Sequence, residues 1–314
     1  MSNPLQNFIQ QYRPQIEREL AENLPLSHQR GTTRFNKALH YAVFPGGKRW
    51  RPVLTLLGGM LVGVPAESLQ AAACAIEYLH TSSMIIDDLP AMDDADLRRG
   101  KPAMHLAYDE STAMLVSLAL MNHSYSLLAL TCRQANHSET TGHLIRQAAE
   151  WIGGDGMIGG QVIDLELRGG APDCGRLDSR NLKTTALMRL MMTAGAIASN
   201  AYEDEISALS RFGDTLGTAY QIYDDLLDEL GERRTLGKTP RQDQRHLCPS
   251  YVSEYGISGA QEMAVEALQK GNRILQQQFG NCLEVDLLAE VAQMIIASPN
   301  QPSHSKHYEL VAAH

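Results

Sequence analysis

Five aspartates and two arginines follow an apolar run in the segment SSMIIDDLPAMDDADLRRG, residues 82–100. Pro90 disfavours a helical conformation at the residue before it. We therefore expect the chain to bend after Asp88, so that Asp93 turns back toward Asp87. Two carboxylates aimed at one point suit Mg²⁺, which prefers oxygen ligands and keeps water molecules for a phosphate partner. The alternative is a solvated acidic loop, although acidic residues at a helix C-terminus oppose the helix dipole.

The stretch before these acids predicts a long helix. Pro65 stands where a first-turn proline belongs, and residues 66–88 contain neither Gly nor Pro. Apolar side chains recur there at steps of three and four residues, as in a helix. On such a helix Glu77, His80 and Asp87 share one face. A helix packed on all sides would not align these side chains unless that face met a polar cavity.

A second acidic helix face is predicted in YQIYDDLLDE, residues 220–229. Its polar residues are spaced i, i+3, i+4 and i+7 and so lie on one side of a helix: Gln221, Asp224, Asp225 and Asp228. Acids on a solvated helix surface would be the simpler interpretation of either motif alone. The two motifs together are harder to attribute to chance.

Cationic residues gather at the predicted loop–helix junctions near the acidic motifs. GGKRWRP (46–52) and LRRGK (97–101) carry three cations each, and two isolated lysines follow. The residues are Lys48, Arg49, Arg51, Arg98, Arg99, Lys101, Lys183 and Lys238. Single Lys and Arg residues are usually solvated, but a local group can hold phosphate oxygens through charge-assisted hydrogen bonds. Beside carboxylates that bind Mg²⁺, such a group points to a diphosphate substrate.

Composition argues against several other classes of protein. The 314 residues have a formal net charge of −9 and no basic run, which argues against a nucleic-acid partner. The 5 cysteines are scattered without a CxxC pair, so neither a disulfide framework nor a zinc site is predicted. The N-terminus lacks a signal-peptide core, and the apolar runs look too short to span a bilayer. We therefore expect a cytoplasmic protein with no transmembrane segment.

Helical periodicity dominates the rest of the chain. Besides the helix that leads to Asp88, helices are expected in the regions 34–43, 51–63, 104–133, 140–152, 181–230, 258–279 and 283–297. Breaks rich in Gly and Pro separate them, and no run of alternating β-branched residues indicates a strand. Because there is no linker, composition shift or repeat, residues 1–314 are predicted to form a single all-α domain.

These motifs together resemble those of the trans-isoprenyl diphosphate synthase, or polyprenyl synthetase, family, and most closely its bacterial-type geranylgeranyl and farnesyl diphosphate synthases. The DDx4D motif of the family stands as DDLPAMD (87–93), and its DDxxD motif stands as DDLLD (224–228). Further matches in the family's order are GGKRWRP, EYLHTSS, GGQVIDLE, LKTTAL and LGKTPRQD. The resemblance spans residues 40–245. It implies an isoprenoid-synthase-type helical bundle around a deep central cavity, in a Mg²⁺-dependent prenyltransferase that is usually a homodimer.

The resemblance assigns the acidic residues to magnesium. Asp87, Asp93 and Asp224 would hold three Mg²⁺ ions, for which Mn²⁺ can substitute. Asp88 and Asp228 would support the ligand shell, with Asp228 as a further metal ligand. The ions would in turn bind the allylic diphosphate substrate.

The resemblance also divides the cations between two substrates. The allylic diphosphate would be bound by Arg98, Lys183 and Lys238. Isopentenyl diphosphate would be bound by Lys48, Arg51, His80 and Arg99. Ionisation of the allylic C–O bond leaves a carbocation, which carbonyl oxygens around Lys183 and Thr184 and the side chain of Gln221 would stabilise.

Product length is predicted from the helix that leads to Asp87. In this family, aromatic residues four and five positions before the motif favour a C15 product, and here those positions hold Ser83 and Ser82. We therefore expect a deeper pocket and geranylgeranyl diphosphate (C20). Met84 or a bulky residue on a neighbouring helix would close the pocket sooner and give farnesyl diphosphate (C15).

Two departures from the family pattern keep other functions open. Cys248 stands where a Lys is usual, and Ser117–Leu118 replaces a common Gly-Asp pair. A weakly active or non-catalytic partner subunit of a heteromeric prenyltransferase is therefore an alternative. A class I terpene cyclase would lack DDLLD, and a purely structural bundle would leave the ordered motifs unexplained. The intact aspartates and arginines favour an active enzyme.

Overall fold

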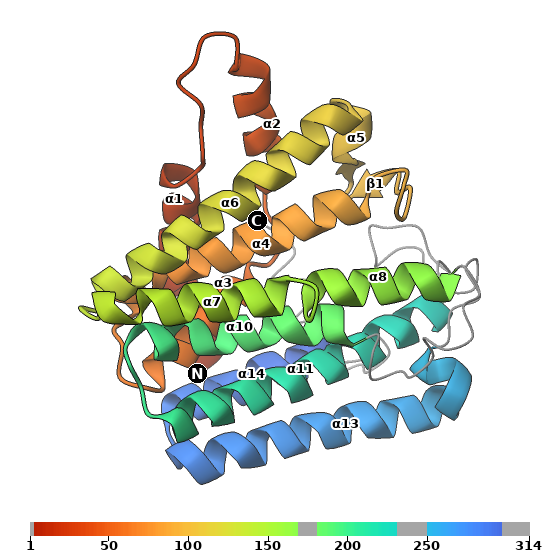
Figure 1. The fold of residues 1–314 in the computed structure, drawn as a ribbon. Coiled ribbons are helices and arrows are strands. Elements are labelled where there is room, and N and C mark those ends of the chain that lie inside the picture. The colour runs from red at the N-terminus through yellow and green to blue at the C-terminus, as the bar shows by residue number, and fades with distance from the viewer. Residues whose placement is uncertain (1–2, 169–180, 231–249, 297–314) are drawn as a thin grey trace.

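The computed structural model describes residues 3–168, 181–230 and 250–296. Stacked helices make up this part of the chain, and its two short strands pair as an antiparallel hairpin (Figure 1). The helices are α1 (Pro4–Glu22), α2 (Thr33–Val43), α3 (Trp50–Met60), α4 (Gln70–Asp87), α5 (Met104–Ala107), α6 (Glu110–Gln134), α7 (Thr141–Ile152), α8 (Met157–Arg168), α10 (Leu182–Ala198), α11 (Glu203–Leu230), α13 (Tyr251–Phe279) and α14 (Leu283–Ile296). The strands are β1 (Leu97–Arg98) and β2 (Lys101–Pro102), and Ala66–Leu69 and Ser138–Thr140 form 3₁₀ turns. The all-α class predicted from the sequence is confirmed.

The helix that carries the first acidic motif, α4, runs through the interior of the bundle. It packs against α1, α2, α3, α6 and α10, and every residue from 71 to 79 is buried. A helix buried on all sides has no polar stripe and needs small side chains where its neighbours cross it closely. The alanines of this segment meet that need, and the motif is thereby attached to a rigid element.

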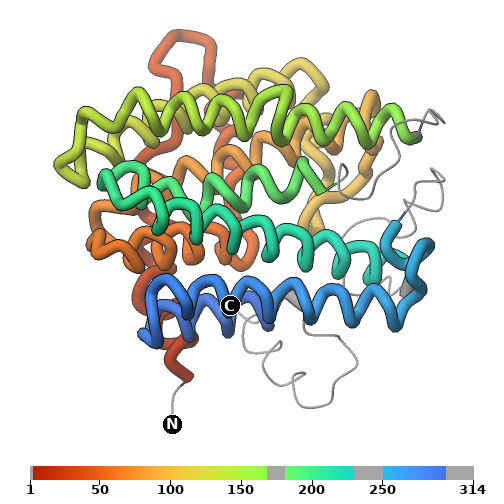
Figure 2. Tube along the Cα trace, turned by 60° about the horizontal axis from the view of Figure 1, so that its bottom comes forward, coloured from red at the N-terminus to blue at the C-terminus, as the bar shows by residue number. Residues whose placement is uncertain are grey.

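Three further motifs, GGQVIDLE, LKTTAL and DDLLD, lie on α8, α10 and α11. Figure 2 shows α10, α11 and α13 following one another across the molecule, and α10 also packs against α8. A Cβ atom on Gly160 of α8 would lie only 2.3 Å from the amide nitrogen of Lys183. Glycine is therefore required where α8 meets the start of α10, and the GGQVIDLE motif supplies it.

Two helices predicted as continuous are each interrupted. Within 104–133 a break precedes α6, where the side chain of Asp109 caps the helix by accepting from the amide nitrogen of Thr112 at 2.6 Å. Within 181–230 the chain turns between α10 and α11, and Asn200 adopts the left-handed conformation there, with φ 57°. Asp and Asn are the residues that favour caps and left-handed turns, so both breaks have a local signal.

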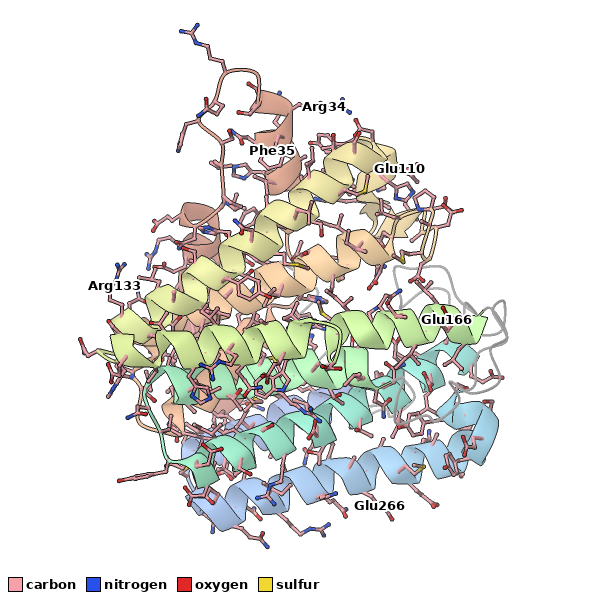
Figure 3. All side chains as sticks on the ribbon, in the orientation of Figure 1. Arg34, Phe35, Glu110, Arg133, Glu166 and Glu266 are labelled. Carbon is pink, nitrogen blue, oxygen red and sulfur yellow. The ribbon has the colours of Figure 1, made fainter. Side chains whose placement is uncertain are left out.

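Among the described helices, α6 alone is long and apolar enough, by length and composition, to cross a membrane. This differs from the expectation that every apolar run would be too short. Core helices of folded proteins meet the same criterion, and α6 packs against α4 and α7. Its first residue, Glu110, and Arg34 of α2 project from the same end of the bundle (Figure 3), where Arg34 Nη2 lies 2.7 Å from Asp109 Oδ2.

Candidate active site

The chain turns back on itself directly after α4. The helix ends at Asp87, before Pro90, as the proline predicts. The amide nitrogen of Asp93 then donates to the carbonyl oxygen of Asp87 at 2.9 Å. The β-hairpin follows, at the same end of the bundle as the last turn of α4 (Figure 1). The predicted return of Asp93 to Asp87 is thus confirmed for the backbone.

A lysine from the start of α10 binds the first aspartate of the motif. Lys183 Nζ lies 2.8 Å from Asp87 Oδ2. The pKa of Asp87 is above its usual value, mainly because the carboxyl group is buried. Lys183 lowers this pKa, and the negative charge of Asp93 raises it further. A buried carboxylate beside a second carboxylate is stabilised in its charged form by a nearby cation. The arrangement therefore favours a divalent cation between the two aspartates.

The second aspartate of the motif holds an arginine. Asp88 is 3% exposed, and Arg98 Nε lies 3.0 Å from each of its carboxylate oxygens, with Nη2 also bound to Oδ1. Burial lowers the pKa of Arg98, but its hydrogen bonds to Asp88 and the negative charges of Asp88, Asp87 and Asp93 together outweigh that effect and raise the pKa above its usual value. A two-pronged bond of this kind fixes the orientation of the guanidinium group. Asp88 is therefore placed to orient Arg98; its predicted support of the metal ligand shell stays a prediction.

Arginines surround His80 of α4. Burial, followed by the positive charge of Arg51, holds the pKa of His80 well below its usual value. Smaller contributions in the same direction come from Arg99, Arg98 and Arg49. Two of these arginines have polar groups that are not fully paired. Arg51 Nε is buried without a hydrogen-bond partner in the part of the chain that the structure describes. Arg99 Nη2 lies 4.0 Å from Glu77 Oε1, which is the limit of an ion pair. A group of desolvated cations of this kind attracts an anion with several charges.

The position of His80 makes the stability of the protein depend on pH. Its folded-state pKa lies below the unfolded value of about 6.5, so only the unfolded chain takes up a proton as the pH falls through and below that value. His80 therefore reduces stability progressively below about pH 6.5, by at most about 1.4 kcal/mol per pH unit. In urea denaturation between about pH 6.5 and 5, the free energy of unfolding should fall more steeply with decreasing pH for the native chain than for His80→Gln. Parallel pH profiles would contradict this assignment.

Arg49 belongs to a buried network of ion pairs. Its side chain is fully buried, with Nη1 2.6 Å from Glu77 Oε1 and Nε 2.9 Å from Glu17 Oε1 of α1. A Cβ on Gly46 would overlap this guanidinium group, which explains one glycine of GGKRWRP. Glu77 thus meets a buried ion pair instead of the polar cavity that its spacing predicted. The phosphate-binding role considered for Arg49 is corrected for the same reason.

Removing the Glu77 charge should destabilise the protein strongly. Glu77→Gln leaves the Arg49 guanidinium without its buried counter-charge, whose side chain is only 3% exposed, at an expected cost of about 3–5 kcal/mol in the free energy of unfolding. Glu17→Gln provides the matched control on the same guanidinium group. It should cost less, because the Glu17 side chain is 31% exposed and water can compensate. Urea denaturation measures both losses, and equal losses would contradict the assignment.

The second acidic motif lies on α11 beside the start of α10. Thr184 Oγ1 donates to Gln221 Oε1 at 3.3 Å. Asp224 and Asp228 are partly exposed, whereas Asp225 is 3% exposed. The Asp225 carboxylate binds Gln221 and the first turn of α13. Helical spacing alone did not distinguish Asp225 from the other two aspartates, and no separate role was predicted for it.

The acidic residues fit a magnesium site with few protein ligands. Within residues 3–168, 181–230 and 250–296, no three His, Cys, Asp or Glu side chains are placed to hold a metal ion by themselves. Mg²⁺ typically takes one or two carboxylates and completes its shell with water and substrate phosphates. Asp87 with Asp93, and Asp224 with Asp228 one helical turn apart, supply oxygen ligands in that number.

The three predicted chain-length residues have different surroundings. Ser82 is fully buried, and its Oγ lies 2.9 Å from Ser117 Oγ and 3.0 Å from the Ser117 carbonyl oxygen. Ser83 is partly exposed, and its hydroxyl donates to a carbonyl of the preceding turn at 2.9 Å. Met84 lines a cavity of about 40 Å³ beside the β-hairpin, with its Sδ 4.0 Å from Arg99 Nη2. The serine that replaces the usual glycine in α6 thus pairs with Ser82.

Two of the predicted features lie outside the described residues. These are Lys238, assigned to the allylic diphosphate, and Cys248, at the usual position of a lysine. Gln161 of α8 was quoted only within a motif, yet its Nε2 lies 3.8 Å from Met92 Sδ in the first acidic segment. The described site therefore joins the ends of α4, α8, α10 and α11.

Several known proteins are similar in sequence over most of this chain. A sequence profile of the polyprenyl synthetase family matches residues 32–284. The farnesyl diphosphate synthase of Bacillus subtilis is 32% identical over 95% of this chain and 99% of its own length. The chloroplastic geranylgeranyl pyrophosphate synthase 11 of Arabidopsis thaliana is 37% identical over 73% of this chain and 65% of its own length.

Solved structures share the fold. An FPP/GFPP synthase from Zymomonas mobilis superposes with a TM-score of 0.80 at 31% identity, covering 93% of this chain and 98% of its own. A geranyltransferase from Helicobacter pylori, complexed with magnesium and isoprenyl diphosphate, superposes with a TM-score of 0.77 at 28% identity, over 94% and 97%. With its two aspartate-rich motifs at one end of such a bundle, the chain belongs to the polyprenyl synthetase family and is a trans-prenyltransferase.

Proposed function

We propose that this trans-prenyltransferase condenses isopentenyl diphosphate with dimethylallyl, geranyl or farnesyl diphosphate and releases geranylgeranyl diphosphate (C20). The C20 product length is inferred from the pair of serines, Ser82 and Ser83, about one helical turn before Asp87. Ser82 meets Ser117 of α6, so both helices contribute a small side chain at this level. An aromatic side chain that would limit the product to C15 is absent from positions 82 and 83.

The acidic residues of both motifs are proposed to hold Mg²⁺, as three ions for which Mn²⁺ can substitute: Asp87, Asp93, Asp224 and Asp228. When bound, the metal stabilises the negative charge that develops on the leaving pyrophosphate. Lys183 and Arg98 already lie against carboxylates of the first motif. They are proposed to bind the same diphosphate and to share its charge.

The arginine group around His80 is proposed to hold isopentenyl diphosphate. Arg51 and Arg99 each have an incomplete set of contacts, and burial lowers the pKa of Lys48. A diphosphate would neutralise these crowded charges, and neutral His80 could donate one N–H to it. The two diphosphates would then be held by cations on either side of the end of α4.

The reaction requires charge separation in a dry pocket. Cleavage of the allylic C–O bond leaves the electron pair on pyrophosphate and a positive charge on the allylic carbon. The double bond of isopentenyl diphosphate attacks that carbon, and pyrophosphate takes the proton that is lost. Gln221 Oε1, next to Thr184, is proposed to face the cation. Buried methionines of α10, such as Met188 and Met191, fit a pocket that excludes water.

Product analysis tests this function. The chain is incubated with Mg²⁺, isopentenyl diphosphate and each of the C5, C10 and C15 allylic diphosphates. C20 is expected as the final product from all three. A C15 end product would overturn the proposed chain length. No turnover with any substrate would instead support the partner-subunit alternative.

Farnesyl diphosphate synthesis (C15) is the second candidate. Ser82 is fully buried and hydrogen-bonded to Ser117 of α6. Its small side chain therefore leaves little room for a growing prenyl chain at position 82. In that case a residue of a neighbouring helix would form the floor. The same product analysis distinguishes the two functions.

We also propose that the protein is a homodimer. Apolar side chains are exposed on one stretch of α6: Met114, Leu115 and Leu118 are 44%, 58% and 59% exposed. A second copy of the chain would cover them, since adjacent exposed apolar residues commonly mark an interface. Leu115→Glu combined with Leu118→Glu should convert a dimer to a monomer in light-scattering measurements of mass. A native chain that is monomeric, or a variant that stays dimeric, would contradict this interface.

A further inference from the structure

Asp225 lies between the second acidic motif and the start of α13. One carboxylate oxygen, Oδ1, accepts from Gln221 Nε2 at 3.0 Å. The other, Oδ2, accepts from the amide nitrogen of Tyr251 at 2.8 Å. Tyr251 is the first residue of α13, where unpaired amide groups and the helix dipole favour a carboxylate. Asp225 is therefore held from two sides and is 3% exposed.

This contact decides which end of the Gln221 amide faces which neighbour. A side-chain amide has a donating nitrogen and an accepting oxygen of similar shape, and its hydrogen-bond partners select between the two orientations. An ionised carboxylate only accepts hydrogen bonds. Because Nε2 must face Asp225, Oε1 faces the other way, where the hydroxyl of Thr184 donates to it at 3.3 Å. The opposite orientation would place two oxygens against each other.

The amide oxygen consequently lies at the start of α10, against the residue that follows Lys183. Thr184 follows Lys183, whose Nζ binds Asp87 at 2.8 Å. An oxygen at this place stabilises an allylic cation by its partial negative charge, whereas an amide NH₂ group would repel it. The orientation therefore matters for the ionisation step and not only for packing.

We propose that Asp225 is a positioning residue, which fixes the amide of Gln221 so that its carbonyl oxygen faces the allylic carbocation. The proposal rests on the proposed function, in which Gln221 borders the reacting carbon. It gives Asp225 a role distinct from that of Asp224 and Asp228, which are the proposed metal ligands of the same motif.

The kinetic test uses Asp225→Asn. An asparagine can offer either an oxygen or an NH₂ group, so Gln221 is no longer restricted to one orientation. We expect kcat to fall about tenfold or more, since loss of one oriented dipole costs up to about 10²–10³-fold. KM for both substrates and the Mg²⁺ concentration for half-maximal activity should stay within about twofold. A rise in the Mg²⁺ requirement that accounts for the loss of kcat would overturn the proposal.

A double-mutant cycle separates positioning from the loss of a charge. In a Gln221→Leu background, Asp225→Asn should cause no further loss of kcat, because the group that it orients is gone. A second loss of equal size would overturn the proposal. Tyr251→Phe is the matched control for α13: it removes the bond between the tyrosine hydroxyl and Asn181 but keeps the amide that binds Asp225. The kcat of Tyr251→Phe should equal that of the native chain. If its kcat falls as far as that of Asp225→Asn, the loss comes from disturbing α13 and not from the Asp225 carboxylate.

A binding test works without turnover. Two bisphosphonate probes are compared, one with a protonated amine at the position of the allylic cation and one with carbon in its place. Asp225→Asn should weaken binding of the amine probe about tenfold and leave the carbon probe unchanged. Equal weakening of both would overturn the proposal. If the native chain shows this discrimination but no turnover, the proposed function fails and the positioning role of Asp225 stands.

Discussion

Replacing Asp87 with Asn is expected to lower kcat by about 10³-fold, because an oriented electrostatic group of the ionisation step is removed. The amide keeps the shape of the carboxylate but carries no charge for Mg²⁺. Lys183 would lose its ion-pair partner, but 26% of its side chain is exposed and water can reach it. The fold should therefore survive, and the loss should appear in kcat with a higher Mg²⁺ concentration for half-maximal activity.

The control for this experiment lies in the same segment. Asp96→Asn removes one carboxylate charge from an exposed position after the bend, and its kcat should stay within about twofold of the native value. Thermal denaturation of both variants checks that neither has unfolded. An Asp87→Asn enzyme that keeps more than about a tenth of the native kcat would rule out a direct contact with the metal. A loss of the same size in Asp96→Asn would show only a general charge effect.

The first motif was predictable because its determinants are local. The helical period before Asp87 and the proline after it specify where α4 ends and where the chain bends. The return of Asp93 follows within one short segment, so no distant contact is needed to place it. The match of GGKRWRP and EYLHTSS to a known family likewise depended on adjacent residues.

Glu77 shows where helical spacing is insufficient. Its position aligns it with His80 and Asp87, yet its partner is Arg49, which arrives from a loop. Arg49 has a φ of 54°, a left-handed conformation that is uncommon for a residue other than glycine. Neither that conformation nor the second partner on α1 could be inferred from a helical period.

The second motif was only half predictable for a related reason. Three aspartates on one helix look equivalent in spacing, and only packing separates them. The contact that buries Asp225 comes from the backbone of Tyr251, 26 positions later in the chain. The partner of Gln221 is Thr184, on another helix. Non-local contacts of this kind require the arrangement of α10, α11 and α13, which no local pattern specifies.

The two serines before the first motif differ in what a large side chain would do. Ser82 has no free space, since its hydroxyl is bound to Ser117 at 2.9 Å and its side chain is fully buried. A tyrosine there would have to push α6 away from α4. Such overpacking costs about 1–3 kcal/mol. Ser82→Tyr is therefore expected to lower stability, and any shorter product would be accompanied by a lower melting temperature.

Ser83→Tyr is the cleaner test, and it should change the main product from C20 to C15. Ser83 is partly exposed and precedes Asp87 by four residues, so both lie on one face of α4. Because helical side chains lean toward the N-terminus, an aromatic ring at position 83 would occupy space below the diphosphate site without separating two helices. Ser83→Ala, which adds no bulk, should keep the C20 product. Chain lengths are compared after complete conversion of dimethylallyl diphosphate (C5) with excess isopentenyl diphosphate. Unchanged C20 synthesis by Ser83→Tyr would place the floor of the pocket on another helix.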